Sequence, residues 1–260
     1  MTAPDLARMA REHAASLQSG GIEWLPNNMK IEIEPSHEPV TTAAQGSPRA
    51  IPMPDSSNPM STVEAPALST DEKKIQLQMM DQKEVKECVK CTELVRNRTR
   101  TVFGIGNVDT ELVFVGEAPG ADEDKAGEPF VGAAGQLLNK IIAACKLKRE
   151  EIYICNVLKC RPPGNRQPLA DEVTFCRGYL ERQLSIIRPR FICCLGLVAA
   201  QTVLNTTTPI GRLRKQIHQY QGMKVVATYH PAYLLRNPNA KKDVWDDMKM
   251  MMEAMGRPVA

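Results

Sequence analysis

Four short apolar runs, separated by segments with helical periodicity, constrain the fold of this chain most strongly. The runs are residues 112–115, 152–156, 191–195 and 224–228, and each has the length of a buried strand. Apolar side chains recur every three or four positions within residues 137–145, 173–187 and 241–255. Strands that alternate with helices are joined by right-handed crossovers. The pattern predicts an α/β fold, a three-layer α/β/α sandwich with a four-stranded, mainly parallel sheet.

The chain of 260 residues divides into three parts of different composition. Residues 1–30 contain a short amphipathic pattern that predicts a helix. Residues 31–70 predict a disordered linker, because they include seven prolines between positions 35 and 66 and have no apolar period. Such a segment cannot bury enough surface to offset the entropy of the chain. Residues 71–260 hold the apolar runs and are predicted to form the compact domain.

Hydropathy and charge limit the cellular location and the kinds of partner that we expect. No stretch approaches the roughly 18 consecutive apolar residues of a membrane span, and the N-terminus lacks the pattern of an export signal. We therefore expect a cytoplasmic protein without a membrane partner. Residues 1–80 carry 6 Lys and Arg against 10 Asp and Glu, and the remainder carries 27 against 20. This basic excess is compatible with a polyanionic partner, although a solvated surface often has the same composition.

A glycine-rich acidic loop, residues 116–132, follows the first apolar run. In open α/β sheets, ligands bind beyond the carboxyl ends of the strands, so the loop predicts an active site. It has neither the Gly-Lys-Ser/Thr of a phosphate-binding loop nor the Gly-x-Gly-x-x-Gly of a dinucleotide fingerprint. Nucleoside triphosphates and NAD are therefore disfavoured as ligands. The alternative is a surface loop whose glycines only form turns.

Polar residues end two of the predicted strands. Asn156 ends the second strand and His230 follows the fourth, so both should meet Glu117 of the glycine-rich loop at one edge of the sheet. An amide that donates and accepts suits the edge of a pyrimidine, and Phe130 could stack on a planar ring. Taken singly, each has a plainer interpretation: a turn residue, a cap or a local hydrophobic plug.

Four of the eight cysteines have the spacing of a metal site. Cys88 and Cys91 form a C-x-x-C pair, and Cys160 and Cys176 provide a second pair. Four thiolates favour zinc or an iron–sulfur cluster, and the ligand count does not separate the two. A redox dithiol is the alternative for the first pair. The remaining cysteines are predicted to be buried small hydrophobes: Cys145, Cys155, Cys193 and Cys194.

Four blocks together resemble the family 4 uracil-DNA glycosylases, the iron–sulfur branch of the uracil-DNA glycosylase superfamily. The blocks are residues 88–91, 116–139, 156–166 and 230–238. The resemblance implies that residues 71–260 form a monomeric catalytic domain that flips uracil out of double- or single-stranded DNA. It further implies hydrolysis of the N-glycosidic bond to leave an abasic site, as in base excision repair. A [4Fe-4S] cluster is implied on Cys88, Cys91, Cys160 and Cys176.

The resemblance also implies roles for the residues at the strand ends. Phe130 would stack on uracil, and Asn156 would pair with its polar edge and reject cytosine. His230 would stabilise the departing uracil anion through a hydrogen bond. Glu117 would position water or support the sugar cation.

Gly116 and Ala118 would contact the substrate from the same loop. Better-known relatives have an aspartate where this chain has Ala118. The resemblance therefore does not fix which residue provides the catalytic carboxylate. Three further carboxylates of the loop are alternatives to Glu117: Asp122, Glu123 and Asp124.

Contacts with DNA are implied for residues after His230 and for several cations. Leu234 would enter the gap left by the flipped base, and Arg236 would seek a phosphate beside it. Four more cations are candidates for phosphate contacts or for simple surface solvation: Arg161, Arg166, Lys159 and Arg214.

Two functions from other classes remain alternatives. The first is a non-catalytic iron–sulfur protein that binds DNA or assists a polymerase. The second is a zinc-stabilised hydrolase that acts on nucleotides.

Overall fold

The computed structural model describes residues 68–259, so the predicted N-terminal helix and nearly all of the predicted linker lie outside the described residues. Within the described part, one sheet has the strand order β1-β3-β2-β4-β6-β5. The strands are β1 (Ile105–Gly106), β2 (Leu112–Gly116), β3 (Tyr153–Asn156), β4 (Phe191–Leu195), β5 (Ile217–Tyr220) and β6 (Met223–Thr228). No helix in residues 68–259 has the length and apolar character needed to cross a membrane.

The four inner strands are parallel and coincide with the four predicted runs to within one residue at each end. Phe114 of β2, for example, pairs with Ile154 of β3 and with Cys193 of β4. The predicted count of four strands needs one correction, because β1 and β5 add an antiparallel strand at each edge. Neither edge strand has an apolar run that would predict it. The β1 strand has only two residues, and β5 includes two polar residues and has no buried position.

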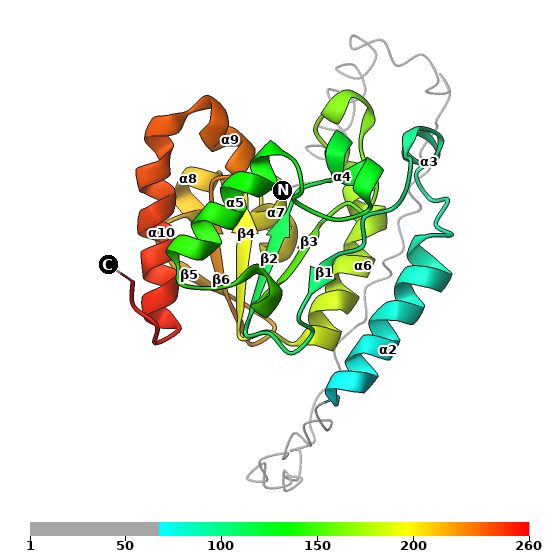
Figure 1. Cartoon of the computed structure of the whole chain (residues 1–260). Helices are drawn as coiled ribbons and strands as arrows, with labels where there is room; N and C mark the ends of the chain where they lie inside the picture. Colours follow the sequence, from blue (N-terminus) through cyan, green and yellow to red (C-terminus); the bar gives the residue numbers. More distant parts are fainter. Residues whose placement is uncertain (1–67, 260) are drawn as a thin grey trace, which may run out of the picture. The chain divides into compact units, whose positions relative to one another are not determined.

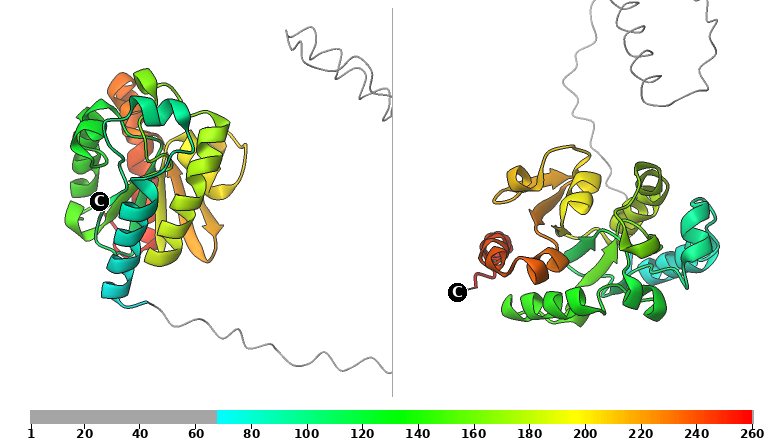
Figure 2. Two further views of the ribbon diagram at one scale, coloured as in Figure 1. Left: turned by 90° about the vertical axis from the view of Figure 1, so that its right-hand side faces the viewer. Right: turned by 90° about the horizontal axis from the view of Figure 1, so that it is seen from above.

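Helices cover both faces of the sheet (Figure 1). One layer contains α2 (Thr70–Met80), α6 (Ala170–Ile187) and α7 (Leu197–Leu204), and the other contains α5 (Ala133–Ala144), α9 (Pro231–Arg236) and α10 (Lys241–Ala254). Figure 2 shows the same arrangement from two further directions. The predicted three-layer α/β/α sandwich is therefore confirmed. Three short helices complete the α-helices of the described part: α3 (Thr92–Asn97), α4 (Ala121–Ala126) and α8 (Ile210–Leu213).

The core consists of two apolar clusters separated by the sheet. Val113 and Val115 of β2 face the α2–α6–α7 layer, whereas Leu112 and Phe114 face the α5–α9–α10 layer. Successive side chains of a strand point to opposite faces, and here both faces are buried. This is why the inner strands read as continuous apolar runs rather than as an alternating pattern.

The α2 helix leads into the first cysteine pair. It begins at Thr70, where the Ser69 side chain caps it and Glu72 completes a capping box. A π-helical turn, Asp81–Val85, then carries the chain to Cys88. Three 3₁₀ turns lie elsewhere in the described part: Arg149–Glu151, Pro163–Asn165 and Pro238–Ala240.

Candidate active site

A cavity of about 490 Å³ lies beyond the carboxyl ends of the parallel strands. Its wall comes from the loop after β2, the end of β3, residues 162–167 and the start of α9. Glu117, Phe130, Asn156 and His230 all line it, as does Ala118. The predicted convergence of these side chains is thus observed, because parallel strands deliver their carboxyl ends to one edge of the sheet.

Asn156 presents an unpartnered polar atom at this cavity. The residue ends β3 and is 1% exposed, and within residues 68–259 its Oδ1 has no hydrogen-bond partner. Gly116 lies directly against it, since a Cβ added there would stand 2.3 Å from Oδ1 and 2.6 Å from the Phe130 ring. A buried acceptor without a donor costs free energy, of about 1–3 kcal/mol. The amide therefore suits a ligand that brings its own N–H group.

Phe130 holds its ring against His230 in an unusual backbone conformation. Its φ is 56°, in the left-handed region that bulky residues rarely adopt. The ring is 5% exposed, and its centroid lies 5.6 Å from that of the His230 ring, with 31° between the planes. Strain of this kind persists only where the surrounding structure fixes it, and it clusters at functional sites.

Glu123 and Asp124 hold the glycine-rich loop in place. The Glu123 carboxylate accepts hydrogen bonds from the backbone N–H groups of Gly120 (3.1 Å), Val131 (3.0 Å) and Gly132 (2.9 Å). Asp124 is buried, and both of its oxygens accept from the Thr99 N–H at 2.9 and 3.0 Å. Both carboxylates are therefore occupied with the protein backbone, which disfavours them as catalytic groups.

Glu117 is the carboxylate best suited to act on a ligand. It is half-buried and lines the cavity, and among the described residues its side chain makes no hydrogen bond or ion pair. Burial raises the pKa of Glu117 above its ordinary value. Asp122, the remaining alternative, also borders the cavity but is exposed.

His230 is held in one tautomer. It is the N-cap of α9, and its Nδ1 accepts a hydrogen bond from the Ala232 N–H at 3.1 Å. A neutral ring that accepts at Nδ1 carries its proton at Nε2. Burial, followed by the positive charge of Arg236, lowers the pKa of His230 to about 4, while Glu123 acts in the opposite direction. At neutral pH the ring is an uncharged donor.

The structure corrects the placement of the predicted DNA wedge. Leu234 is 1% exposed and packs in the apolar cluster between the sheet and the α5–α9–α10 layer. The α9 helix begins at Pro231, and this start turns position 234 towards the core. Its neighbours Tyr233 and Leu235 are 39% and 49% exposed, and Arg236 is exposed at the rim of the cavity.

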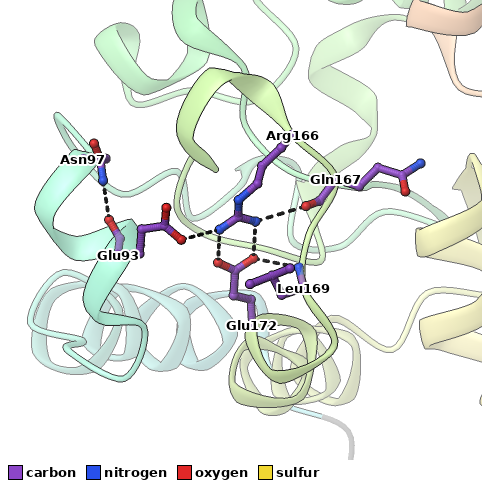
Figure 3. Close-up of polar contacts among 6 residues, drawn as sticks. All are labelled: Glu93, Asn97, Arg166, Gln167, Leu169 and Glu172. Atoms are coloured by element: carbon purple, nitrogen blue, oxygen red, sulfur yellow. Dashed lines mark hydrogen bonds and ion pairs between the residues drawn. The ribbon is translucent and has the colours of Figure 1, made fainter. Parts of the chain in front are cut away.

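Of the four other predicted phosphate contacts, Arg166 is held by ion pairs at the surface, and Lys159 and Arg214 are buried. The Arg166 guanidinium pairs with both oxygens of Glu172 and with Glu93, and it also donates to the Gln167 carbonyl (Figure 3). Lys159 and Arg214 are buried, with 1% and 5% exposure, so they cannot reach a phosphate as the resemblance suggested. Arg161 is half-buried and bonds only the nearby Asn165 side chain.

The four predicted ligand cysteines gather in one place. Cys160 and Cys176 are buried, and Cys88 and Cys91 pack against the same apolar cluster. Burial and then the charges of the other three thiols raise the pKa of Cys91 to about 12. Within residues 68–259, no three side chains of His, Cys, Asp or Glu are close enough together to bind one metal ion.

A charged hydrogen-bond donor contacts this thiol set. Arg98 donates from Nη1 to the sulfur of Cys160 at 3.2 Å. Donors of this kind stabilise thiolates that bind metal. The other cysteines of the chain are buried among apolar side chains, as predicted: Cys145, Cys155, Cys193 and Cys194.

Comparison with known proteins identifies the family. The family model described as "Uracil DNA glycosylase superfamily" matches residues 103–249. The chain belongs to the uracil-DNA glycosylase superfamily. The matched segment contains all four residues that converge on the cavity, together with Cys160 and Cys176.

Curated members of this superfamily align along most of their length. A type-4 uracil-DNA glycosylase of Archaeoglobus fulgidus is 46% identical over 183 residues, which cover 67% of this chain and 92% of the relative. A type-4 enzyme of Thermotoga maritima is 47% identical over 155 residues, covering 59% and 80%. A third, from Sulfurisphaera tokodaii, is 42% identical over 179 residues, covering 65% and 81%.

Sequence reasoning missed several residues that line the cavity, two of them with large side chains. These two are Tyr233 and Gln167. Tyr233 lies three residues after His230, so a helix starting at position 231 would have placed both on one side. Gln167 lies in an irregular segment after a 3₁₀ turn and gave no periodic signal.

Proposed function

We propose that this chain is a uracil-DNA glycosylase of the type-4 kind, which removes uracil from DNA and leaves an abasic site. The observation that carries the proposal is the buried Oδ1 of Asn156, which has no partner among residues 68–259 and shares one cavity with Phe130 and His230. The names and the 40–47% identity of its type-4 relatives support the same activity.

Recognition requires the base to leave the helix, because its polar edge is otherwise paired inside the duplex. In the cavity the Phe130 ring stacks on the flipped base. The Asn156 amide accepts from N3–H of uracil through Oδ1 and donates to O4 through Nδ2. Cytosine has an acceptor at N3 and a donor at N4, so it leaves both atoms of the amide without a partner. Such a mismatch of buried polar groups discriminates strongly.

Cleavage moves the electrons of the N-glycosidic bond onto the base. The sugar becomes oxocarbenium-like and uracil departs as an anion. The Nε2–H of neutral His230 donates to O2 of the base, where negative charge develops. Glu117 orients the water that attacks the anomeric carbon or stabilises the cation. The water gives its hydroxyl group to the sugar, and its proton passes to the surroundings.

We further propose that Cys88, Cys91, Cys160 and Cys176 hold a [4Fe-4S] cluster. The thiols influence one another electrostatically, yet they are not at the spacing of ligands to a single ion. Four thiolates can hold such a cluster, one for each iron, and the similarity to type-4 uracil-DNA glycosylases favours it over zinc. When bound, the cluster ties residues 88–91 and the loop after β3 to α6, and its role is architectural because cysteines fill all four protein-ligand positions.

Visible absorption and iron content test the cluster. We expect purified protein to be brown and to contain iron, and Cys88→Ala to remove the colour. Cys145→Ala is the matched control, because this buried cysteine lies in the opposite apolar cluster. Colourless wild-type protein with one bound zinc would contradict the proposal.

DNA contacts are proposed for the exposed rim of the cavity. Arg236 at the rim and half-buried Arg161 nearby would contact phosphates, and exposed Leu235 and Tyr233 replace Leu234 as the candidates to fill the gap in the duplex. We propose that the enzyme acts as a monomer in the cytoplasm on single- or double-stranded DNA.

Excision from a labelled oligonucleotide tests the function. Alkali should cut the strand at uracil after incubation with the protein and should leave a cytosine-containing strand intact. Glu117→Gln should slow excision by about 100-fold or more, whereas Asp122→Asn should stay near the wild-type rate. A wild-type protein that binds the oligonucleotide but releases no uracil would instead support the non-catalytic DNA-binding alternative.

A further inference from the structure

A buried ion pair lies behind the end of β6 and takes no part in the proposed chemistry. Arg214 donates from Nε to Oδ2 of Asp247 at 2.7 Å, and the two side chains are 4% and 0% exposed. The same oxygen accepts from the Thr228 hydroxyl at 2.6 Å. Within residues 68–259, Oδ1 of Asp247 has no hydrogen-bond partner. Nη2 of Arg214 makes no hydrogen bond either, but it lies 3.5 Å from Oδ1 of Asp243 in a second ion pair. Removing two charges from water costs so much free energy that a buried ion pair need not stabilise the fold. A role other than stability therefore has to be considered.

This pair contacts the two residues that directly precede His230. Thr228 ends β6 and binds Asp247 through its side chain. The guanidinium carbon of Arg214 lies 4.1 Å from the centroid of the Tyr229 ring, which is close enough for a cation–π contact. The backbone of Thr228 is fixed as well, because its carbonyl accepts from the Gly196 N–H at 2.8 Å.

The contact extends to the cavity wall. The Tyr229 ring lies 5.0 Å from the ring of Tyr233, which lines the cavity. Arg214, Tyr229 and Tyr233 therefore form a stack that runs from the buried pair to the cavity. His230 lies between the two tyrosines in sequence, so a shift of this stack would move its ring.

We propose that Arg214 and Asp247 are positioning residues, which hold Thr228 and Tyr229 so that the Nε2–H of His230 points at the departing base. The inference rests on the role proposed for His230. A donor to developing negative charge works only when it is held in place beforehand, because a displaced donor loses most of its effect. The pair therefore acts through His230 and does not touch the substrate.

Thr228→Val tests the inference, because it removes the hydroxyl and keeps the shape. We expect it to slow single-turnover uracil release about tenfold, the effect of one lost hydrogen bond. Affinity for DNA with an abasic site should stay unchanged. Thr228→Ser restores the hydroxyl and should restore the rate. The matched control is Asp246→Asn, because Asp246 neighbours Asp247 on α10 but is 45% exposed.

Nuclear magnetic resonance of the His230 ring gives a readout that needs no turnover. The charged groups that act on this ring are Arg236 of α9 and Glu123 of α4, and neither is altered in the variants. We expect the titration midpoint of His230 to rise in Thr228→Val towards that of an ordinary histidine, and to stay low in Thr228→Ser and Asp246→Asn.

An unshifted His230 titration together with a wild-type rate in Thr228→Val would overturn the inference. Equal slowing in Thr228→Ser would overturn it too. If Thr228→Val does not fold, Tyr229→Leu takes its place with Tyr229→Phe as the conservative partner, and the same outcomes apply. A wild-type protein that releases no uracil refutes the proposed function, while the titration still shows whether the ion pair positions His230.

Discussion

Asn156 and His230 differ in how far the protein itself satisfies their hydrogen-bonding groups. His230 has a partner for Nδ1 in the Ala232 N–H, which leaves Nε2–H to donate. Asn156 keeps a buried Oδ1 that no donor of residues 68–259 reaches. The contact to Nδ1 fixes the proton of His230 on Nε2. The Oδ1 of Asn156 selects a ligand that carries an N–H donor. The two residues can therefore divide the work, Asn156 reading the base and His230 stabilising its charge.

Asn156→Ala should separate activity from stability. Loss of the amide should lower uracil excision by about 100-fold or more, since a lost oxyanion-type or base-reading donor costs about 3 kcal/mol. The midpoint of thermal unfolding should not fall by much, because the substitution also removes an unsatisfied buried acceptor. Asn97→Ala, at an exposed position, should change neither. Near-normal excision by Asn156→Ala would contradict the role of the amide.

The pH dependence of excision should have no midpoint near 6.5 that belongs to His230. The pKa of His230 is lowered to about 4, so the ring stays a neutral donor as the pH falls through 6.5. The pKa of Glu117 is raised, so the acid side of the wild-type profile should lie above 4.5 and report Glu117. In Glu117→Gln that limb should move to about 4. Single-turnover rates measure this, and a midpoint near 6.5 that persists in Glu117→Gln would refute a neutral His230.

At the scale of elements, the end of β3 connects the cavity to the thiol set. Asn156 is followed three residues later by Lys159, and Cys160 comes next. The Lys159 ammonium donates to the Asn156 carbonyl at 2.7 Å and to Oε1 of Gln183 on α6 at 2.6 Å. The α6 helix also carries Cys176. Lys159 thus fixes the end of β3 to the helix that provides one of the proposed cluster ligands.

Lys159→Met should destabilise the fold and impair excision together. It leaves two buried oxygens without their charged donor, at a cost of about 1.5–3 kcal/mol for each bond lost. Chemical denaturation measures the free energy of unfolding, and Lys140→Met at an exposed position is the control. A variant as stable and active as the wild type would show that the carbonyl of Asn156 does not need this anchor.

The same elements show what could be predicted from sequence. The inner strands were predictable because Val113 and Phe114 are buried on opposite faces, which produces an uninterrupted apolar run. The edge strand β5 was not, because its side chains are half exposed and its pairing depends on a two-residue turn, Gln221 and Gly222, with φ of 48° and 81°. Leu234 was misplaced because its burial depends on where α9 begins.

At the scale of the whole molecule, the site draws on residues far apart in the chain. Glu117, Asn156 and His230 meet because parallel strands share one edge, which the strand pattern predicted. The fates of Arg166 and Arg214 were not predictable, because their partners Glu172 and Asp247 lie on helices whose packing sets the contact. Sequence pattern thus located the cavity, whereas it could not tell exposed cations from buried ones.

Residues 68–260 should suffice for excision. Every residue of the cavity and of the thiol set lies between positions 88 and 236. A chain of residues 68–260 should therefore match the full chain in kcat/KM on a uracil-containing oligonucleotide. A chain of residues 103–260 is the control, because it lacks Cys88 and Cys91 and should lose the colour and the activity. Loss of activity in a folded, brown 68–260 chain would assign a catalytic need to residues 1–67.

A crystal structure with an oligonucleotide that carries uracil on a slowly cleaved 2′-fluoro sugar would show how the cavity holds the base. The measured quantity is the distance from the Asn156 amide to the base. We predict about 2.7–3.2 Å to both N3 and O4, with the Phe130 ring stacked on the base and Nε2 of His230 within the same range of O2. A uracil that lies outside this cavity, or with its N3–O4 edge turned away from Asn156, would refute base recognition by this residue.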